Sequence, residues 1–367
     1  MQPFLRRRAR MRARVTTIVT SAVTLAALLP GVAYAAAPGN DAFAGATPLT
    51  TVPTTAEVAL AEATAEPGEP NPSCTTSTGA PSAWFAFTAP RTEWITLART
   101  SYDWDTVLAV YTGESLDGLT EVLCADYDRR VLAVTAGQTY RIQLTNWRPE
   151  ATPTQIALAV APTLKTQIAE SLSDPSSLDT VTYYQYPYDN VGASITRVEW
   201  DFGDGTTANG NSATHRFTAD GDYVVRVNIT SADGRTATAT RAVAVRTHDV
   251  RVAGFTVPTA GRVGQTKPIE VTVANQRLPE YATVVLYRGD PSGFHEIARA
   301  TQYVPARPDR TVAFPFNYTF TPDDAAIGKV TFRTVVLLAE GVRDVRTIDN
   351  EAIAPATTVR PSTSEVS

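Results

Sequence analysis

The sequence is poor in the residues that metal and nucleophilic chemistry use. Its 367 residues include three histidines, His215, His248 and His295, which are too scattered along the chain to complete a Cys/His zinc site. The sequence has no nucleophile elbow, no histidine pair at ligand spacing and no glycine loop of the kind that cradles phosphate. These absences favour a protein that does not catalyse a reaction.

Cysteine is equally scarce, since the chain has only Cys74 and Cys124, both in its first third. Two cysteines in an oxidising compartment usually pair. Closing a loop of about 50 residues would contribute on the order of 3 to 4 kcal/mol by the loop-entropy estimate. We therefore predict a Cys74–Cys124 disulfide, and a thiol pair that binds metal is the alternative.

Long hydrophobic runs are absent except near the N-terminus, where one extends from Val15 to Leu29. The A-x-A sequence that a signal peptidase recognises follows it at residues 33–35, so we predict an export signal over residues 1–36. A membrane anchor is the alternative, but the run is shorter than the roughly 20 residues that a spanning helix needs. The basic segment typical of an export signal precedes the run and consists of Arg6, Arg7, Arg8, Arg10, Arg12 and Arg14.

Clustered positive charge is missing from the rest of the chain. Removing the signal takes away six arginines and no acids, which lowers the formal charge from −5 to −11. A nucleic-acid partner would require a basic face that displaces counterions from phosphates. We expect no such partner, and we expect a secreted, soluble mature chain without a membrane span.

Amphipathic helices longer than two turns are also missing from residue 37 onward. Strand-like runs instead recur every 8 to 15 residues between clusters of Gly, Pro, Asp and Asn, a pattern that predicts β-sandwiches. Residues 140–144 alternate apolar and polar side chains, as expected when one face of a sheet packs on a core and the other meets water.

Changes in composition divide the chain further. We predict an all-β protein of three consecutive sandwich domains, one jelly-roll-like and two immunoglobulin-like. The predicted boundaries are 37–160, 164–246 and 247–355. The Pro-, Ser- and Thr-rich residues 356–367 are expected to form a disordered tail.

The middle segment contains the most specific motif. A strand that ends in a Trp-Asp-Phe-Gly-Asp-Gly sequence is followed by His215 and Phe217 in a His-x-aromatic element. This combination resembles the PKD domain, an immunoglobulin-like sandwich common on bacterial surface proteins and secreted hydrolases. The resemblance implies structural roles, namely a buried Trp, a turn and a His that ties a loop down, and it implies a spacing or interaction function. The motif residues are Trp200, Asp201, Phe202, Gly203, Asp204, Gly205 and His215.

The first segment resembles the bacterial pre-peptidase C-terminal type of domain, a jelly-roll-like sandwich appended to secreted proteases and surface proteins. The resemblance rests on residues 40–43, 66–70, 82–90, 102–113 and 137–144. After Cys124 this chain has Arg129 and Arg130 where relatives often have acids and glycines, which weakens any metal site carried over by analogy.

The third segment resembles the CARDB type, a bacterial adhesion-related immunoglobulin-like fold. The resemblance is diffuse, and it rests on residues 248–252, 264, 269–275, 282–287 and 344–352 occurring in the right order.

Four acids of the first segment suggest a calcium site. Asp103, Asp105, Asp126 and Asp128 could supply the oxygen ligands that calcium prefers if their two loops adjoin. No cofactor is required by this interpretation, since aspartates also stabilise turns without a metal. A glycosidase pair among the same acids is the least favoured alternative.

Three tryptophans of the first segment are candidate ligand contacts. Trp94 and Trp147 occupy the polar faces of their strands, and Trp104 lies in the acidic loop. An exposed aromatic ring beside polar groups is suited to binding a glycan or a protein. The alternative is that neighbouring domains or loops cover these rings.

Together these features predict a non-catalytic extracellular adhesion or ligand-binding protein. Its partner would be a polysaccharide, the cell envelope or a surface protein, and the second and third domains would act as spacers. The first alternative is an accessory protein that accompanies a secreted hydrolase, and the second is an unrecognised hydrolase.

Overall fold

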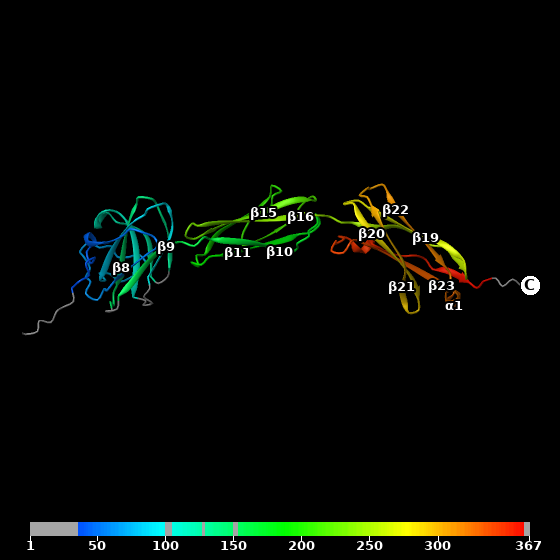
Figure 1. Ribbon diagram of the computed structural model, residues 1–367, viewed down its shortest axis with the longest axis horizontal. Coiled ribbons are helices and arrows are strands. Elements are labelled where there is room, and N and C mark those ends of the chain that lie inside the picture. The colour runs from blue at the N-terminus through cyan, green and yellow to red at the C-terminus, as the bar shows by residue number, and fades with distance from the viewer. Residues whose placement is uncertain (1–35, 100–104, 127–128, 150–152, 363–367) are drawn as a thin grey trace, which may run out of the picture.

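The computed structural model describes residues 36–99, 105–126, 129–149 and 153–362. Its β-sheets form three sandwiches that lie one after another along the long axis of the molecule (Figure 1). The predicted all-β fold is therefore confirmed. No helix in the described ranges is long and apolar enough to cross a membrane.

The first sandwich packs a five-stranded sheet against a four-stranded one. Alternate side chains such as Phe85, Ile142 and Ile95 point between the two sheets and form the main core. Strands β1 and β3 pair in parallel, and the other pairs in these two sheets are antiparallel. The first sheet has the order β1(Thr47–Leu49), β3(Ser82–Thr88), β8(Thr139–Asn146), β5(Thr106–Thr112), β6(Thr120–Ala125), and the second β2(Thr54–Val58), β9(Thr154–Val160), β4(Glu93–Arg99), β7(Arg130–Val134).

The second sandwich packs a three-stranded sheet against a four-stranded one. Val198, Trp200 and Phe202 point into its core, as their alternation predicts. The three-stranded sheet has the order β10(Lys165–Glu170), β11(Val181–Tyr188), β14(Ser212–His215). The four-stranded sheet has the order β13(Thr207–Asn209), β12(Ile195–Asp201), β15(Gly221–Ser231), β16(Thr236–Val245).

The third sandwich has its own core, which includes Ile269, Phe314 and Phe332. One short helix, α1(Pro322–Ile327), begins at a capping box formed by Thr321 and Asp324. One sheet has the order β17(Val250–Thr256), β19(Thr266–Asn275), β22(Thr311–Thr319). The other has the order β18(Ala260–Arg262), β25(Thr357–Arg360), β23(Lys329–Leu337), β20(Glu280–Asp290), β21(Gly293–Val304), with β24(Glu351–Ile353) also paired to β23.

The expectation of a disordered tail from residue 356 is wrong for β25. This strand pairs in parallel with β18 and antiparallel with β23. Thr357 and Val359 point inward and are buried, and the Thr357 hydroxyl donates to the carbonyl of Pro258 over 2.6 Å. The stretch forms a strand because its alternate residues can be buried and because the edge of β23 is available for pairing. These two features favour order more strongly than the polar composition favours disorder.

The motif of the second sandwich builds a rigid corner. Gly203 has a φ of 77°, and a Cβ there would lie 2.8 Å from the carbonyl oxygen of Val224, so both the backbone angle and the available space require glycine. His215 stacks on Phe202 at a centroid distance of 4.1 Å, and its Nε2 lies 2.7 Å from Oδ2 of Asp204. This geometry agrees with the structural roles that the PKD resemblance implies.

Candidate functional site

A loop covers the outer face of the five-stranded sheet in the first sandwich. This covering segment, residues 64–81, follows the core residue Ala63 and leads into β3. Cys74 and Cys124 form a disulfide with a Cα–Cα distance of 5.7 Å, which confirms the predicted pair. The backbone N–H of Ser73 also donates to Glu121 over 2.9 Å. Both contacts attach the covering segment to β6.

The covering segment changes the environment of the sheet face beneath it. The alternation of residues 140–144 predicts that this face meets water, and that prediction is wrong, because Gln143 is 1% exposed and the nearby Thr145 is 3% exposed. The same face carries a small second core of Phe43, Trp84, Ala109 and Tyr111. Sequence alternation distinguishes the two faces but does not show that a distant loop lies over one of them.

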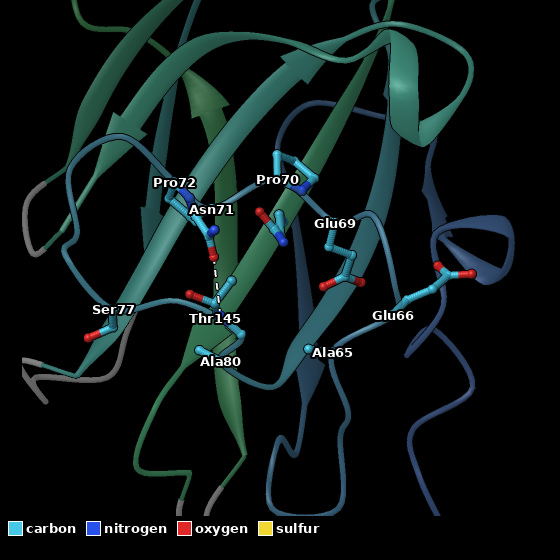
Figure 2. Close-up of a pocket in the computed structure, with 11 residues that line it drawn as sticks. Ala65, Glu66, Glu69, Pro70, Asn71, Pro72, Ser77, Ala80 and Thr145 are labelled. Carbon is cyan, nitrogen blue, oxygen red and sulfur yellow. Dashed lines mark hydrogen bonds between the residues drawn. The ribbon is translucent and has the colours of Figure 1, made fainter.

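A cavity of about 180 Å³ lies between the covering segment and the sheet (Figure 2). Its polar side includes Glu69, Gln143 and Thr145. Its apolar side consists of alanine and proline side chains. The described residues that line it are Ala65, Glu66, Glu69, Pro70, Asn71, Pro72, Ser77, Gly79, Ala80, Gln143 and Thr145.

Glu69 is the central charged group of this cavity. Its Oε1 accepts hydrogen bonds from Nε1 of Trp84 over 2.7 Å and from Oγ of Ser82 over 2.9 Å, and its Oε2 accepts from Oγ of Ser82 over 2.8 Å. Burial raises the pKa of Glu69, and the hydrogen bonds from Trp84 and Ser82 only partly offset that rise. The negative charge of Glu66 raises it further.

The remaining polar groups of the cavity differ in whether they have hydrogen-bond partners within the chain. Oε1 of Gln143 accepts from the Tyr111 hydroxyl over 3.0 Å, and Oδ1 of Asn71 accepts from the backbone N–H of Gly79 over 3.2 Å. The buried hydroxyl of Thr145 finds no hydrogen-bond partner among the described residues. Such a group is destabilising unless something outside the chain bonds to it.

Of the three tryptophans predicted to contact a ligand, two lie in the described residues. Trp94 on β4 is half-buried against the second sandwich, where a Cβ added to Gly234 would lie 3.0 Å from its ring. Trp147 is half-buried just beyond β8. Trp104 lies outside the described residues. The contact of Trp94 with Gly234 fits the alternative that a neighbouring sandwich covers this ring. Ligand binding by Trp94, Trp104 and Trp147 stays a prediction.

The predicted calcium ligands are only partly described. Asp105 and Asp126 lie in the described residues, whereas Asp103 and Asp128 lie outside them. Within the described residues no group of three or more His, Cys, Asp or Glu side chains could hold a metal ion. The four-aspartate calcium site therefore stays a prediction.

No pattern in the sequence predicts a role for the acids of the cavity. Glu66 and Glu69 belong to the stretch that supports the likeness of the first segment to other domains, yet nothing near them along the chain marks a site. The only local signal is two acids in a Pro- and Gly-rich loop a few residues before Cys74. Their significance arises from the sheet below, where Ser82 and Trp84 of β3 bond to Glu69 and where Gln143 and Thr145 of β8 lie more than 70 positions along the chain.

Comparison with known protein families assigns the second sandwich. Residues 146–245 match the family model of the PKD domain, which confirms the resemblance. This match covers the second sandwich but less than half of the chain. The microbial collagenase of Vibrio alginolyticus is 34% identical over 67 residues, which make up 18% of this chain and 8% of the collagenase. The chain thus spans less than a tenth of the length of this relative.

Solved structures of similar domains include PKD and CARDB examples. The PKD1 domain of Vibrio anguillarum Epp is 22% identical with a TM-score of 0.21, and the match covers 23% of this chain and 95% of that domain. The CARDB domain of a Pyrococcus furiosus protein, in complex with di-metal ions, is 20% identical with a TM-score of 0.26, covering 31% of this chain and 89% of that one. These likenesses carry no functional argument.

Proposed function

We propose that this chain is a non-catalytic extracellular adhesion or ligand-binding protein. The first domain, residues 37–160, would bind, and the domains at 164–246 and from 247 onward would hold it at a distance. The observation that carries this proposal is that the middle sandwich is braced at both of its ends. A spacer holds a fixed distance only if its junctions resist bending.

The first junction centres on Arg235. Residues 161–164 separate β9 from β10, and the carbonyl of Pro162 in this linker accepts from Nη1 of Arg235 over 2.9 Å. Nη2 of Arg235 also pairs with Asp189 at 2.8 Å and with Asp233 at 2.7 Å. The Arg235 side chain is only 4% exposed, so its position is well defined. Together with the packing of Trp94 on Gly234, these bonds hold the linker against the middle sandwich.

The second junction centres on Thr247. Residues 246–249 separate β16 from β17. The buried Thr247 hydroxyl donates to Asp220 over 2.5 Å and accepts from the backbone N–H of Ser177 over 2.9 Å. An ion pair between Asp179 and Arg343 then connects the second sandwich to the third. Short linkers with several side-chain contacts favour a stiff chain over a freely hinged one.

Three further observations support the extracellular setting. These are the N-terminal segment with the features of an export signal, the disulfide between Cys74 and Cys124, and the PKD domain together with the partial similarity to a microbial collagenase. On this proposal the partner is a polysaccharide, a cell-envelope component or a surface protein. The contact residues would include Trp147 and Trp104, with Trp94 at the edge of the first junction.

Small-angle X-ray scattering of the mature chain tests the spacer. We expect one narrow distribution of extended shapes at low ionic strength, where the Asp179–Arg343 ion pair is least screened. A variant with a Gly-Ser insertion between Thr163 and Leu164 is the matched control, because it separates Arg235 from the linker, and it should broaden the distribution. If the unaltered chain is already as broad as this variant, the spacer proposal is wrong.

An array of polysaccharides and cell-wall fragments tests the binding role. The mature chain should bind a small number of components saturably, with and without calcium. Trp147→Ala should weaken that binding, whereas Tyr186→Ala, which changes an exposed ring on the middle sandwich, should leave it unchanged. An array without any saturable binding would favour an accessory role beside a secreted hydrolase.

The partial match to a collagenase favours one second candidate, an accessory protein that acts beside a secreted hydrolase. Adding the purified chain to a co-secreted hydrolase should then raise the rate of release from an insoluble substrate without any turnover by the chain alone. Equal rates with and without the chain would exclude this role.

A further inference from the structure

A second cleft, of about 410 Å³, lies between the first and second sandwiches, which adjoin in Figure 1. One wall consists of residues 123 and 129–131, at the ends of β6 and β7. The other wall consists of residues 191–194 in the β11–β12 loop and residues 232–233 in the β15–β16 turn. Ligand sites occur preferentially at domain interfaces and have volumes of roughly 300 to 1,000 Å³, so this cleft has the position and the size of a binding site.

The walls of this cleft are positively charged, although the whole chain has a formal charge of −5. Arg129 and Arg130 are exposed, and neither side chain has an ion pair or a hydrogen bond within the described residues. The one acid on the described walls is Asp233, whose Oδ2 accepts from Nη2 of Arg235 over 2.7 Å. Its charge is therefore compensated within the second sandwich, and two guanidinium groups without an acidic partner remain at the cleft.

The other wall residues limit the kind of anion. A guanidinium group keeps its charge at any physiological pH, and its planar fork suits carboxylates and other oxyanions. Across the cleft, the hydroxyl of Ser194 is exposed and has no hydrogen-bond partner within the described residues. Leu123 and Val131 supply apolar surface between these polar groups. A sugar that bears an acidic group matches all three features, because it offers an anion, hydroxyls and an apolar ring face.

The placement of the two arginines favours a polymer over a single small anion. Arg130 is the first residue of β7, and Arg129 directly precedes it. Successive side chains of an extended chain point in opposite directions, so the two guanidinium groups are separated and would meet different acidic groups. A polymer with an acid on each repeating unit supplies such groups at intervals.

We propose that this cleft binds an anionic polysaccharide. Acidic groups of neighbouring sugar units would pair with Arg129 and Arg130, and a sugar hydroxyl would bond to Ser194 on the opposite wall. The bound polymer would thus contact both sandwiches. This inference rests on the proposed binding function, and it narrows the polysaccharide partner to one with acidic sugar units.

Titration calorimetry on the mature chain tests the proposal. The probes are oligomers of galacturonate for a carboxylate and oligomers of dextran sulfate for a sulfate. We expect saturable binding of at least one of them, and the affinity should fall as salt is added, because the ion pairs are screened. Galacturonate oligomers with methyl-esterified carboxylates are the matched neutral probe and should not bind. Equal or tighter binding of a single-stranded oligonucleotide of the same charge would overturn the assignment to a polysaccharide.

Paired double variants separate the cleft from the net charge of the chain. Arg129→Gln together with Arg130→Gln should weaken the acidic probe by about tenfold for each charged hydrogen bond that is lost. Arg226→Gln together with Arg251→Gln removes the same charge from two exposed positions outside the cleft and should leave binding unchanged. Equal losses in the two double variants would overturn the site.

Two further variants test the wall supplied by the second sandwich. Ser194→Ala should weaken the acidic probe several-fold, because one hydrogen bond is lost. The Gly-Ser insertion between Thr163 and Leu164 moves the two walls apart and should also weaken it. Thermal unfolding of each variant confirms that the fold is retained, as expected for changes at exposed positions. Unchanged binding in both of these variants would show that the arginines act without the cleft and would overturn the proposal.

Failure of this site differs from failure of the proposed function. If the mature chain binds neither acidic probe saturably, the inference about the cleft is wrong. The proposed binding role still stands in that case if the chain binds neutral components of the array through Trp147. The scattering test of the spacer is made without ligand, so its result is independent of the cleft.

Discussion

The first and second sandwiches each bury a tryptophan, but in different layers. Trp200 lies between the two sheets of the second sandwich, and its Nε1 donates to the carbonyl of Gly210 in the adjacent hairpin over 2.8 Å. Trp84 lies on the outer face of a sheet in the first sandwich, and its Nε1 donates to Glu69 in the covering segment. Trp200 therefore stabilises the packing of two sheets on each other, whereas Trp84 stabilises the covering segment on the outer face of one sheet.

The outer faces of the two sandwiches differ accordingly. On β11 of the second sandwich, Tyr184, Tyr186 and Tyr188 alternate with inward residues and are exposed, the middle one by 58%. On β8 of the first sandwich, the outward-facing Gln143 and Thr145 are buried. The same period-two pattern thus has opposite outcomes, because the covering segment lies over β8 in the first sandwich, whereas the outward side chains of β11 in the second are exposed.

The largest expected effect of a single substitution is on the second sandwich. Trp200→Ala removes a fully buried ring and should lower the free energy of unfolding of this sandwich by about 3 to 5 kcal/mol. Urea unfolding followed by circular dichroism measures the change. The transition of the first sandwich should remain in place. A loss below about 1 kcal/mol would mean that the ring is not part of the central packing.

The next largest effect is expected from the disulfide, and it should be confined to the first sandwich. Replacing Cys74 and Cys124 together by Ser should cost about 3 to 4 kcal/mol, because the 50-residue separation no longer restricts the unfolded chain. Reduction of the unaltered chain should have the same effect, and the double variant is the control that reductant leaves unchanged. An equal loss of unfolding free energy in the second sandwich would contradict the expectation that the disulfide stabilises only the first sandwich.

Substitutions on the two outer faces should differ by a smaller margin. Gln143→Ala leaves the buried Tyr111 hydroxyl without its acceptor and should cost about 1 to 3 kcal/mol. Tyr186→Ser changes an exposed side chain and should stay within about 0.5 kcal/mol. Thermal unfolding of the two variants under identical conditions measures both values. Equal costs would show that the covering segment does not exclude water from β8.

The smallest expected difference is in how the stability of each sandwich depends on pH. Lowering the pH should destabilise the second sandwich and stabilise the first. Burial opposes ionisation of Asp189 and Asp233, but the hydrogen bonds and charge of Arg235 outweigh it and lower the pKa of both below the ordinary value of 3.8. The unfolded chain then binds more protons, so this stabilisation is present above pH 3.8 and is lost as pH falls through the lowered values.

Glu69 should act in the other direction. Because burial raises its pKa above 4.5, the folded chain binds the proton first, and the first sandwich gains stability as pH falls through that raised value toward 4.5. Calorimetric melting of the chain between pH 7 and 3 measures both trends, and Glu69→Gln should remove the gain. A parallel pH dependence of the two transitions would count against these assignments.

Much of the second sandwich could be predicted from sequence because its motif is local. Trp200, Phe202 and His215 lie within 16 residues of one another, and each contact among them follows from one strand, one turn and the next hairpin. The disulfide was equally accessible, since two cysteines allow one pairing. The buried Arg235 was not, because its partner Asp189 lies 46 residues away and no local pattern links them.

The amino-acid order was sufficient for the class of fold, the alternation of strand faces and the PKD motif, because these depend on neighbours one to a few residues apart. Four features depended on the folded chain, namely the covered face of β8, the cavity at Glu69, the strand at Thr357–Arg360 and the braced junctions. Each of them joins segments distant in sequence, and a side chain's burial and charge environment follow from what packs over it in space.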